Sequence, residues 1–382
     1  MPDDLNLTAT EILPEAGALL IGRVWSNAAD GPCPVLLRGG QVLDLTRLSP
    51  TLSGLLERDD LNQDLAADYP SLGPLDGFLD GTLGRLLAPC DLQAIKAAGV
   101  TFAGSMIERV IEERAKGDPA RAEVIRAELA GLLGGSLKGV VPGSEAAATV
   151  KAKLQAAGMW SQYLEVGIGP DAEIFTKGQP MSALGCGAQI GVHRASRWNN
   201  PEPEVVLAVN SKGRICGATL GNDVNLRDVE GRSALLLGKA KDNNGAAAIG
   251  PFLRLFDGAF TLAVAERLQV TLKITGTDGF VLEAGSDMGQ ISRPPADIVA
   301  QAINRSHQYP DGLMLFLGTM FAPTKDRDAP GQGFTHHPGD RVEIASGPLG
   351  RLVNVTRACD EIAPWTFGVG ALMRNLAGRG VL

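Results

Sequence analysis

The sequence has little of what nucleic-acid-binding, secreted or membrane proteins need. Its 382 residues include 35 lysines and arginines against 43 aspartates and glutamates, so the formal net charge is -8 and no basic surface for nucleic acid is expected. No apolar run approaches the roughly 18 residues of a membrane-spanning helix, and the acidic start MPDDLNLTATE is unlike a signal peptide. We therefore expect a soluble, cytoplasmic protein with neither nucleic acid nor a membrane as a partner.

Cysteine and histidine are also scarce. The five cysteines are widely spaced and form no CxxC pair, which argues against a disulfide framework and against a zinc site. Two of the four histidines, His336 and His337, are adjacent, and on a strand their side chains would point to opposite faces rather than to one metal. No GxSxG, HExxH or Walker sequence is present, and GCGAQIG (185–191) lacks the helix that follows a dinucleotide-binding loop. These absences argue against nucleophilic-serine, zinc-protease and nucleotide-binding chemistry.

Glycine and proline, by contrast, are abundant. The chain has 48 glycines and 23 prolines, with 45% hydrophobic and 20% charged residues, which favours a globular protein rich in turns and strands. Its length suits two domains of roughly 100 to 200 residues each. We predict an α+β protein with a small N-terminal α/β domain at 1–150 and a mostly β domain at 151–382, where short apolar runs alternate with Gly and Pro turns.

Local patterns predict elements within the N-terminal part. Apolar, β-prone runs at 18–25 and 34–46 indicate a small antiparallel sheet, with a tight turn at Arg38-Gly39-Gly40. From 104 to about 134 the apolar spacing i, i+3, i+4 indicates two helices separated at Asp118-Pro119. Ser144 is expected to cap a third helix, which ends at Gly158.

Two carboxylates lie two residues apart where an apolar strand begins. Glu202 and Glu204 belong to the segment WNNPEPEVVLAVN, and because strand side chains alternate with period two, both point to one face. Pro203 supplies no backbone donor, which places this end at a strand start or a sheet edge. An alternative interpretation is that both glutamates are solvated edge-strand residues without a metal.

The returning segment RICGATLGND brings a third carboxylate to the same end. A hairpin centred on the turn at 210–213 would place Glu204 opposite about Thr219, Glu202 opposite about Gly221, and Asp223 just beyond them. Three like charges in a partly buried pocket are destabilising unless a cation or protons neutralise them. An all-oxygen ligand set favours Mg²⁺, Mn²⁺ or Ca²⁺ over zinc. The sequence therefore predicts a site for a hard divalent cation, Mg²⁺ in the first place.

Basic residues follow the third carboxylate. The guanidinium of Arg227 can hold a substrate carboxylate through two hydrogen bonds. Lys239 and Lys241 come next, and a lysine beside a divalent ion has its ammonium form disfavoured, so that it can accept a proton. Each residue alone would more often lie on the surface, so the interpretation depends on the whole cluster.

Together these motifs resemble the fumarylacetoacetate hydrolase superfamily, in which ExE on one strand precedes the Asp of an NDxxxRD-like segment and then a lysine. The resemblance extends from about Gly99 to the C-terminus and includes FTKGQP with Lys177 and the pair Gly318-Thr319, which contacts substrate in relatives. It is closer still to the sugar-acid dehydratases of that superfamily, through the segments GPDAEIFTK, WNNPEPEVVLAVN, GNDVNLRD and AKDNN.

The resemblance implies a catalytic domain of the fumarylacetoacetate hydrolase type, a mixed β-sandwich roll, at residues 151–382. It implies a hydro-lyase that converts a 2-keto-3-deoxy-pentonate, which we expect to be the D-xylonate-derived one, to 2-oxoglutarate semialdehyde. The residues carried over are the metal ligands Glu202, Glu204 and Asp223, the catalytic pair Glu173 and Lys241, and the substrate-binding Arg227, Lys177 and Thr319. One of the catalytic pair would remove a C3 proton and the other would protonate the departing C4 hydroxyl. A homodimer or larger homo-oligomer is also implied.

The sequence departs from the hydrolytic members at one point. In those, a GxNYxxHxxE segment supplies a His and a Glu that activate water, whereas here the segment is GVTFAGSMIE, with Ser105 in place of the His and Glu108 left with a structural role. A serine is no general base near neutral pH without help. Dehydration is therefore favoured over carbon-carbon hydrolysis of a 2,4-diketo acid, and a non-catalytic metal-binding relative is the third alternative.

Overall fold

The computed structural model describes residues 5, 7–15, 17–102, 106–107, 110–111, 114, 124–125, 127–131, 140–320, 325–329 and 333–382. Within these ranges two β-sheets dominate, with short helices around them, and the predicted α+β class is confirmed. No helix in the described part of the chain combines the length and the apolar character that crossing a membrane requires.

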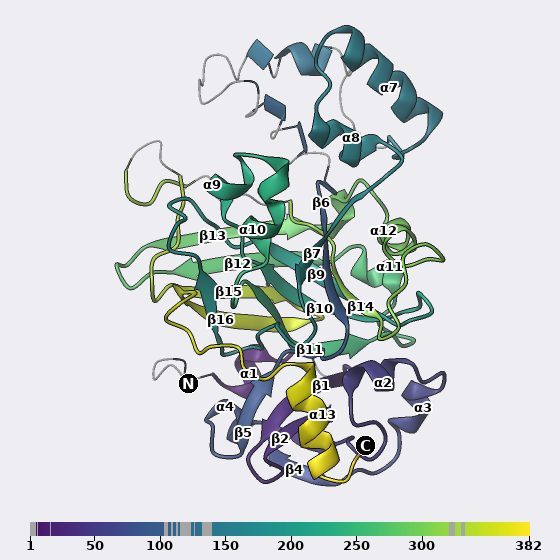
Figure 1. Ribbon diagram of the computed structural model, residues 1–382, viewed down its shortest axis with the longest axis vertical. Coiled ribbons are helices and arrows are strands. Elements are labelled where there is room, and N and C mark those ends of the chain that lie inside the picture. Colours follow the sequence, from purple (N-terminus) through teal and green to yellow (C-terminus); the bar gives the residue numbers. More distant parts are fainter. Residues whose placement is uncertain are drawn as a thin grey trace.

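The larger sheet runs through most of the molecule (Figure 1). Its strands, in spatial order, are β4 (Ser71–Pro74), β3 (Gln41–Asp44), β2 (Gly31–Arg38), β1 (Leu20–Ser26), β11 (Ala247–Leu255), β10 (Ile215–Asp223), β9 (Pro203–Val209), β14 (Leu313–Phe316), β6 (Ala94–Gly99) and β7 (Glu173–Gly178). A further strand, β5 (Gly84–Leu87), pairs with β1. The predicted antiparallel sheet near the N-terminus is confirmed as β1, β2 and β3, and Gly39 and Gly40 form the β2–β3 turn with φ of 57° and 76°.

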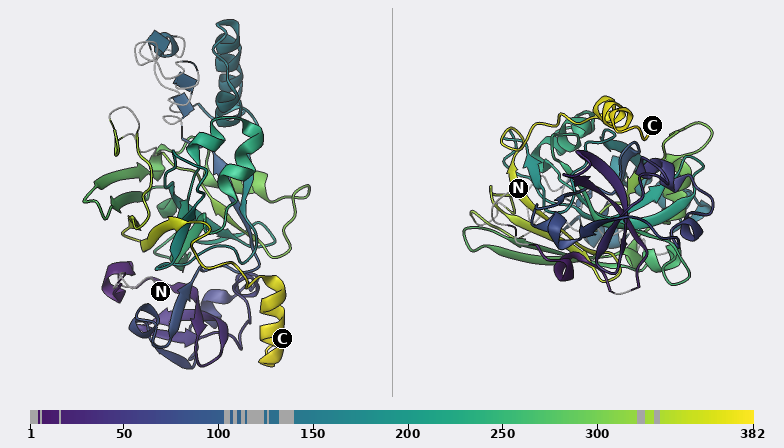
Figure 2. Two further views of the ribbon diagram at one scale, coloured as in Figure 1. Left: turned by 60° about the vertical axis from the view of Figure 1, so that its left-hand side comes forward. Right: turned by 90° about the horizontal axis from the view of Figure 1, so that it is seen from below.

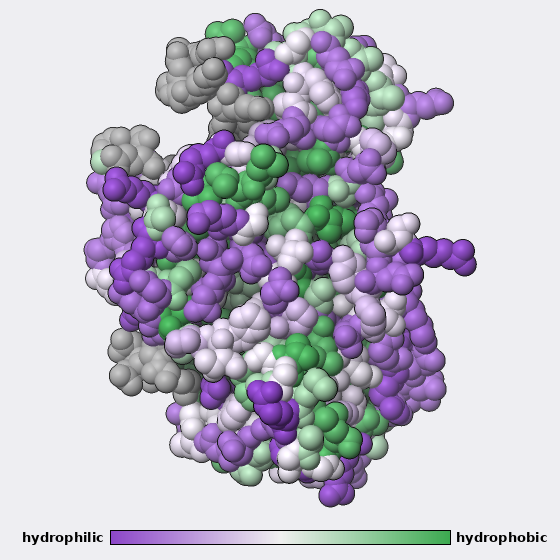
Figure 3. Space-filling model, in the orientation of Figure 1, coloured by the Kyte–Doolittle hydropathy of each residue, from purple (hydrophilic) through white to green (hydrophobic). Residues whose placement is uncertain are grey.

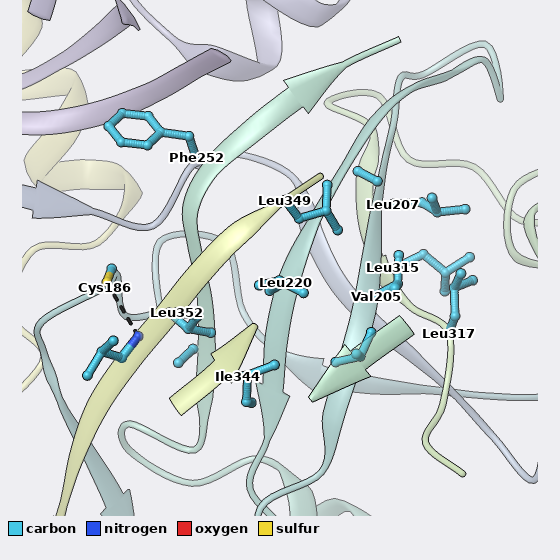
Figure 4. Packing of buried hydrophobic residues seen from close by; sticks show 14 of the residues in the cluster. Cys186, Val205, Leu207, Leu220, Phe252, Leu315, Leu317, Ile344, Leu349 and Leu352 are labelled. Atoms are coloured by element: carbon cyan, nitrogen blue, oxygen red, sulfur yellow. Dashed lines mark hydrogen bonds between the residues drawn. The ribbon is translucent and has the colours of Figure 1, made fainter. Parts of the chain in front are cut away.

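The smaller sheet has the spatial order β13 (Val281–Asp287), β12 (Gln269–Thr275), β15 (Arg341–Ser346), β16 (Gly350–Ala358) and β8 (Gln189–Val192). It packs against one face of the larger sheet, and the main core lies between the two. Figure 4 shows Val205, Leu207 and Leu220 of the larger sheet facing Ile344 and Leu352 of the smaller one. All five side chains are buried, which supplies the apolar contact that holds the two sheets together.

The helices are mostly short and lie around the sheets. They are α1 (Ala9–Ile12), α2 (Leu52–Leu56), α3 (Leu61–Asp64), α4 (Asp76–Leu79), α7 (Glu145–Ala156), α8 (Gln162–Ile168), α9 (Arg227–Glu230), η1 (Ala234–Leu236), α10 (Leu237–Lys241), α11 (Leu262–Ala265), η2 (Met288–Gln290), α12 (Pro295–Ala302) and α13 (Val369–Gly378). Figure 2 shows α7 at one end of the molecule and α13 at the other, beside the N-terminal strands. Figure 3 shows apolar surface in the region of α9 and α10, where Leu235 is 94% exposed.

The helix predictions met different outcomes. The Ser144 cap is confirmed, since its side chain accepts a hydrogen bond from Ala147 N at the start of α7, and Gly158 follows the helix with φ of 65°. The two helices predicted at 104–134 fall largely outside the described residues.

The division near residue 150 stays a prediction. The larger sheet contains strands from both sides of it, because β6 pairs with β14 and β7. The C-terminal helix α13 also contacts the N-terminal strands, where Asn375 Nδ2 donates to Asp30 O at 2.7 Å and Arg379 Nη1 donates to Pro32 O at 2.8 Å.

Candidate active site

The hairpin of β9 and β10 sets the position of the three carboxylates. Glu204 is opposite Gly221, not Thr219 as predicted, and Asp223 N donates to Glu202 O at 3.0 Å. The predicted register was wrong by two residues, because the turn spans 210–214 and a bulge follows Ile215. A shift of two residues keeps every side chain on its predicted face, so the carboxylates still converge.

Glu202, Glu204 and Asp223 offer carboxylate oxygens that all lie within 4.8 Å of one another. The three residues are only 6%, 3% and 1% exposed. Gly318 N donates to Glu204 Oε2 at 2.6 Å, and Asn225 Nδ2 donates to Glu202 Oε1 at 3.1 Å. The structure thus brings together the three carboxylates that the sequence singled out, on the face of the larger sheet turned away from the smaller sheet.

Two buried lysines enter this carboxylate cluster. Lys241, at the end of α10, donates from Nζ to Glu202 Oε2 and, at 3.1 Å, to Asp223 Oδ2. Lys177, on β7, contacts Asp223 Oδ1 at 2.8 Å and donates to Val224 O at 3.1 Å and to Lys241 O. Lys177 thus makes two hydrogen bonds to backbone carbonyls and one ion pair with Asp223, and these contacts favour a role in holding the cluster. Its predicted substrate contact stays a prediction, and Lys239 is exposed.

The electrostatics of the cluster follow from burial and from an excess of negative charge. Burial, and then the charges of Asp223 and Glu202, raise the pKa of Glu204 well above its ordinary value. Burial opposes the charged form of Lys241, but Asp223 and Glu202 outweigh it and raise the pKa of Lys241. For Lys177 the effect of burial is the stronger one, and its pKa is lowered.

The residues present fit a hard divalent cation. Three carboxylates and two ammonium groups leave the cluster one formal negative charge, which attracts a cation. Asn225 Oδ1, which is buried, has no hydrogen-bond partner among the described residues, although Nδ2 of the same side chain binds Glu202. Buried polar atoms normally have a partner, and oxygen donors of this kind suit Mg²⁺ or its water ligands.

Glu173 lies at the start of β7, on the same face as the cluster. Phe175 and Lys177 follow it at intervals of two, and both contact Lys241, the Phe175 ring at 5.7 Å from Nζ. Thr176, between them, faces the other side and accepts from Lys96 Nζ at 2.8 Å. Strand alternation therefore directs Glu173 toward the side of the sheet that carries the carboxylates.

The predicted substrate residues lie next to the ligand segments in sequence. Arg227 is half-buried at the start of α9, and its guanidinium stacks on the Trp198 ring with 4.4 Å from Cζ to the centroid. Thr319 directly follows Gly318, whose backbone N–H binds Glu204. Ser105 and Glu108 lie outside the described residues.

Sequence reasoning missed the groups that orient the ligands. Asn225 donates to both Glu202 and Glu230, and Asn222 Oδ1 accepts from Glu202 N at 3.2 Å. The signal was present, because Asn225 follows Asp223 by two residues and so belongs to the same run of buried polar groups. The N–H of Gly318 could not be found in this way, since any residue except proline carries one.

Two relatives named as dehydratases of keto-deoxy sugar acids are similar to part of this chain. No family model matches the chain. The chain is 33% identical over 181 residues to 2-dehydro-3-deoxy-D-arabinonate dehydratase of Saccharolobus solfataricus, covering 47% of this chain and 57% of that relative. It is 26% identical over 204 residues to a probable 2-keto-3-deoxyxylonate dehydratase of Haloferax volcanii, covering 53% of this chain and 66% of that relative. The chain thus matches less than two thirds of the length of either relative.

Solved structures establish the fold. A 2-keto-3-deoxy-D-arabinonate dehydratase complexed with magnesium and 2,5-dioxopentanoate superposes with a TM-score of 0.64 at 21% identity, over 89% of this chain and 99% of that chain. Fumarylacetoacetate hydrolase from Exiguobacterium antarcticum superposes with a TM-score of 0.55 at 15% identity, over 89% and 100%. The chain has the fumarylacetoacetate hydrolase fold, and the resemblance predicted from the sequence is confirmed.

Proposed function

We propose that this protein is a magnesium-dependent hydro-lyase that removes water from a 2-keto-3-deoxy-pentonate, the D-xylonate-derived one, and yields 2-oxoglutarate semialdehyde. One observation carries the proposal: three buried carboxylates lie within 4.8 Å of one another, and the ammonium of Lys241 binds two of them. The similarity to relatives named as dehydratases of such keto acids supports the choice of reaction.

In the proposed site Glu202, Glu204 and Asp223 hold Mg²⁺, with Mn²⁺ or Ca²⁺ as substitutes to be tested. When bound, the cation would supply Lewis-acid chemistry to a 2-keto acid. Asn225 and the N–H of Gly318 keep two of the carboxylates oriented through hydrogen bonds of 3.1 and 2.6 Å. Such partners of ligand groups typically contribute about 10- to 100-fold in metal affinity or activity.

Substrate binding is assigned to Arg227 and Thr319. The Trp198 ring beneath the Arg227 guanidinium restricts its orientation, which suits a planar group that makes two parallel hydrogen bonds to a carboxylate. Thr319 would offer its hydroxyl beside the Gly318 N–H that binds Glu204.

Glu173 and Lys241 are assigned the proton transfers. One removes a C3 proton, and the other protonates the C4 hydroxyl as the C4–O bond breaks and water leaves. Removal of a C5 proton and protonation at C3 then give an enol across C4 and C5, which tautomerises to the aldehyde. The reaction therefore requires a hydroxyl at C5, and each stage adds and removes one proton with no oxidant or reductant.

The decisive experiment is incubation of the purified protein and Mg²⁺ with each 2-keto-3-deoxy-pentonate stereoisomer, followed by identification of the products. In D₂O the proposed route places solvent deuterium at C3 and C4 of the semialdehyde. Glu173→Gln should lower the rate by about 10² to 10⁴, as loss of a general acid or base usually does. Rapid release of pyruvate from a 2,4-diketo acid, with slower dehydration of every keto-deoxy acid, would establish the hydrolase alternative instead.

We also propose that the protein forms a homodimer or a larger homo-oligomer. The apolar surface around η1, where Leu235 is 94% exposed, supports this proposal, because contact with a second copy of the chain would bury it. Sedimentation of the wild-type protein and of Leu235→Asp tests this, because a monomeric wild type would remove the proposal.

A further inference from the structure

A row of residues crosses four strands from the carboxylate cluster to Glu173. Phe316 of β14 lies between Val206 of β9 and Ala97 of β6. Ala97 in turn pairs with Phe175 of β7. Directly opposed residues share a face of the sheet, and so do those two positions further along each strand.

Two positions along β9, β6 and β7 lie Glu204, Gly99 and Glu173, whereas β14 ends at Phe316 and Gly318 follows it. Gly99 is paired with Glu173, and Gly318 N donates to Glu204 Oε2 at 2.6 Å. The two glutamates therefore lie on the outer two of these four strands, β9 and β7, with Gly99 on β6 between them. Neighbouring strands are about 4.8 Å apart, so the backbones of the glutamates are separated by three such steps along the sheet.

The Glu173 side chain does not project straight from its own strand. A β-carbon built on Gly99 would overlap Glu173 Oε2, would lie 2.7 Å from Cδ, and would lie 3.4 Å from Cγ. The end of the side chain is thus nearer to β6 than its base is. The carboxylate occupies the space above Gly99, one strand closer to Glu204 than its own backbone.

We propose that Gly99 is a positioning residue of the active site, whose missing side chain lets the Glu173 carboxylate lie over β6 toward the metal-binding carboxylates. This inference rests on the proposed function in one respect, the proton-transfer role of Glu173. This position brings the Glu173 carboxylate within reach of the substrate carbons beyond the keto group. A side chain that projected straight from β7 would leave the carboxylate one strand further from Glu204.

A methyl group at this position displaces the carboxylate without preventing folding. The three atoms nearest to a β-carbon at residue 99 all belong to the outer part of the Glu173 side chain, which can rotate away. The Gly99→Ala protein should therefore fold, with its buried carboxylates unchanged.

The experiment is a double-mutant cycle with the full-length protein and Mg²⁺. Gly99→Ala should lower kcat about 10²-fold, the effect of a misplacement of about 1 Å, and should leave KM and Mg²⁺ affinity within about twofold. Because Gly99 acts only through Glu173, adding Gly99→Ala to Glu173→Gln should produce no further loss. Additive losses, or an unchanged kcat in Gly99→Ala, would overturn the proposal.

The matched control is Gly258→Ala. Gly258 is exposed, and a β-carbon there meets no atom within 4 Å, so this variant should keep full activity and reports the cost of a glycine replacement alone. If the wild-type protein dehydrates no keto-deoxy acid, the proposed function fails, and crystal structures of the wild-type and Gly99→Ala proteins still decide the inference. A Glu173 carboxylate in the same place in both would refute it.

Discussion

Two buried charge clusters in the described part of the chain shift the pKa of a buried carboxyl group in opposite directions. In the carboxylate cluster, Glu204 is buried with two like charges and its pKa is raised. In the second, Arg327 holds both oxygens of Asp340, at 2.6 and 2.8 Å, and His336 Nδ1 lies 3.2 Å from Oδ2. Burial alone would raise the pKa of Asp340, but the hydrogen bonds from His336 and Arg327 outweigh it and lower the pKa to about 2.

The difference is one of charge balance. Around Glu204 the negative charges are only partly neutralised, whereas the charge of Asp340 is neutralised by Arg327. Carboxylates outnumber cations around Glu204, so this cluster gains from an added cation. The Arg327 cluster joins the segment before β15 to Asp278 in the β12–β13 turn, with Nη2 of Arg327 at 3.1 Å from Asp278 Oδ2. We therefore expect mutations in the first cluster to remove function with little loss of stability, and mutations in the second to do the reverse.

Replacing a carboxylate of the first cluster should have the largest effect. Glu204→Gln should abolish tight Mg²⁺ binding and lower activity by about 10³-fold or more, because a Lewis acid supplies several kcal/mol and each 1.36 kcal/mol is tenfold in rate. The neutral amide also removes one of three like charges, so the metal-free variant should unfold at no lower denaturant concentration than the metal-free wild type. Isothermal titration with Mg²⁺ and urea denaturation measure both. If the wild type stays active after complete chelation of Mg²⁺, the carboxylate cluster does not act through a bound cation.

Removing the cation of the second cluster should come next. Arg327→Met leaves the Asp340 carboxylate buried without its charged partner and should lower the free energy of unfolding by about 3–5 kcal/mol. The kcat of the protein that remains folded should be unchanged, because Arg327 has no assigned contact with substrate or metal. Asp278→Asn, which removes the partly exposed partner of the same arginine, is the control and should destabilise far less. Equal losses of unfolding free energy in Arg327→Met and Asp278→Asn would mean that the burial of Asp340 does not determine the loss of stability.

How far the sequence predicts these two clusters depends on the range of the contacts. Glu202 and Glu204 could be placed on one face because strand alternation is local, and the face survived a register error of two residues. The bulge after Ile215 that caused the error has no reliable local signal. The contacts of Lys177 with Asp223 could not be derived, because they bring β7 against a residue far along the chain.

The second cluster was missed altogether. The sequence favours a turn at Pro338-Gly339-Asp340 beside His336 and His337 over a shared metal, but it does not predict that His336 pairs with Asp340 or that His337 N donates to Asp340 Oδ2 at 2.9 Å. The i, i+4 spacing of His336 and Asp340 hinted at a local contact. The role of Arg327 in completing it depends on the path of the intervening loop, which hydrophobic periodicity does not encode.

A smaller effect is expected at Arg227, which stacks on Trp198 beside the first cluster. Arg227→Ala should raise KM by roughly 10- to 100-fold, since hydrogen bonds to a charged group contribute about 1.5–3 kcal/mol. Arg227→Lys keeps the positive charge but not the planar pair of donors, so its KM should lie between those of the wild type and Arg227→Ala. Steady-state kinetics at fixed Mg²⁺ provide the measurement. A loss of Mg²⁺ affinity in Arg227→Ala would show that the residue supports the metal ligands instead of the substrate.

The smallest effect concerns pH and the second cluster. Burial lowers the pKa of His336 below its ordinary value of 6.5, although Asp340 opposes this, so the unfolded chain takes up a proton at higher pH than the folded protein. The stability contributed by neutral His336 is therefore fully present above pH 6.5 and is lost as the pH falls through 6.5 toward the folded-state pKa. Urea denaturation between pH 8 and pH 5 should show this decline in the wild type and a shallower one in His336→Asn, whose amide can still donate to Asp340. His307→Asn, at an exposed histidine, should follow the wild type. If the free energy of unfolding of His336→Asn falls as steeply with pH as that of the wild type, His336 is protonated in the folded protein. The contrast between the two clusters then does not extend to His336.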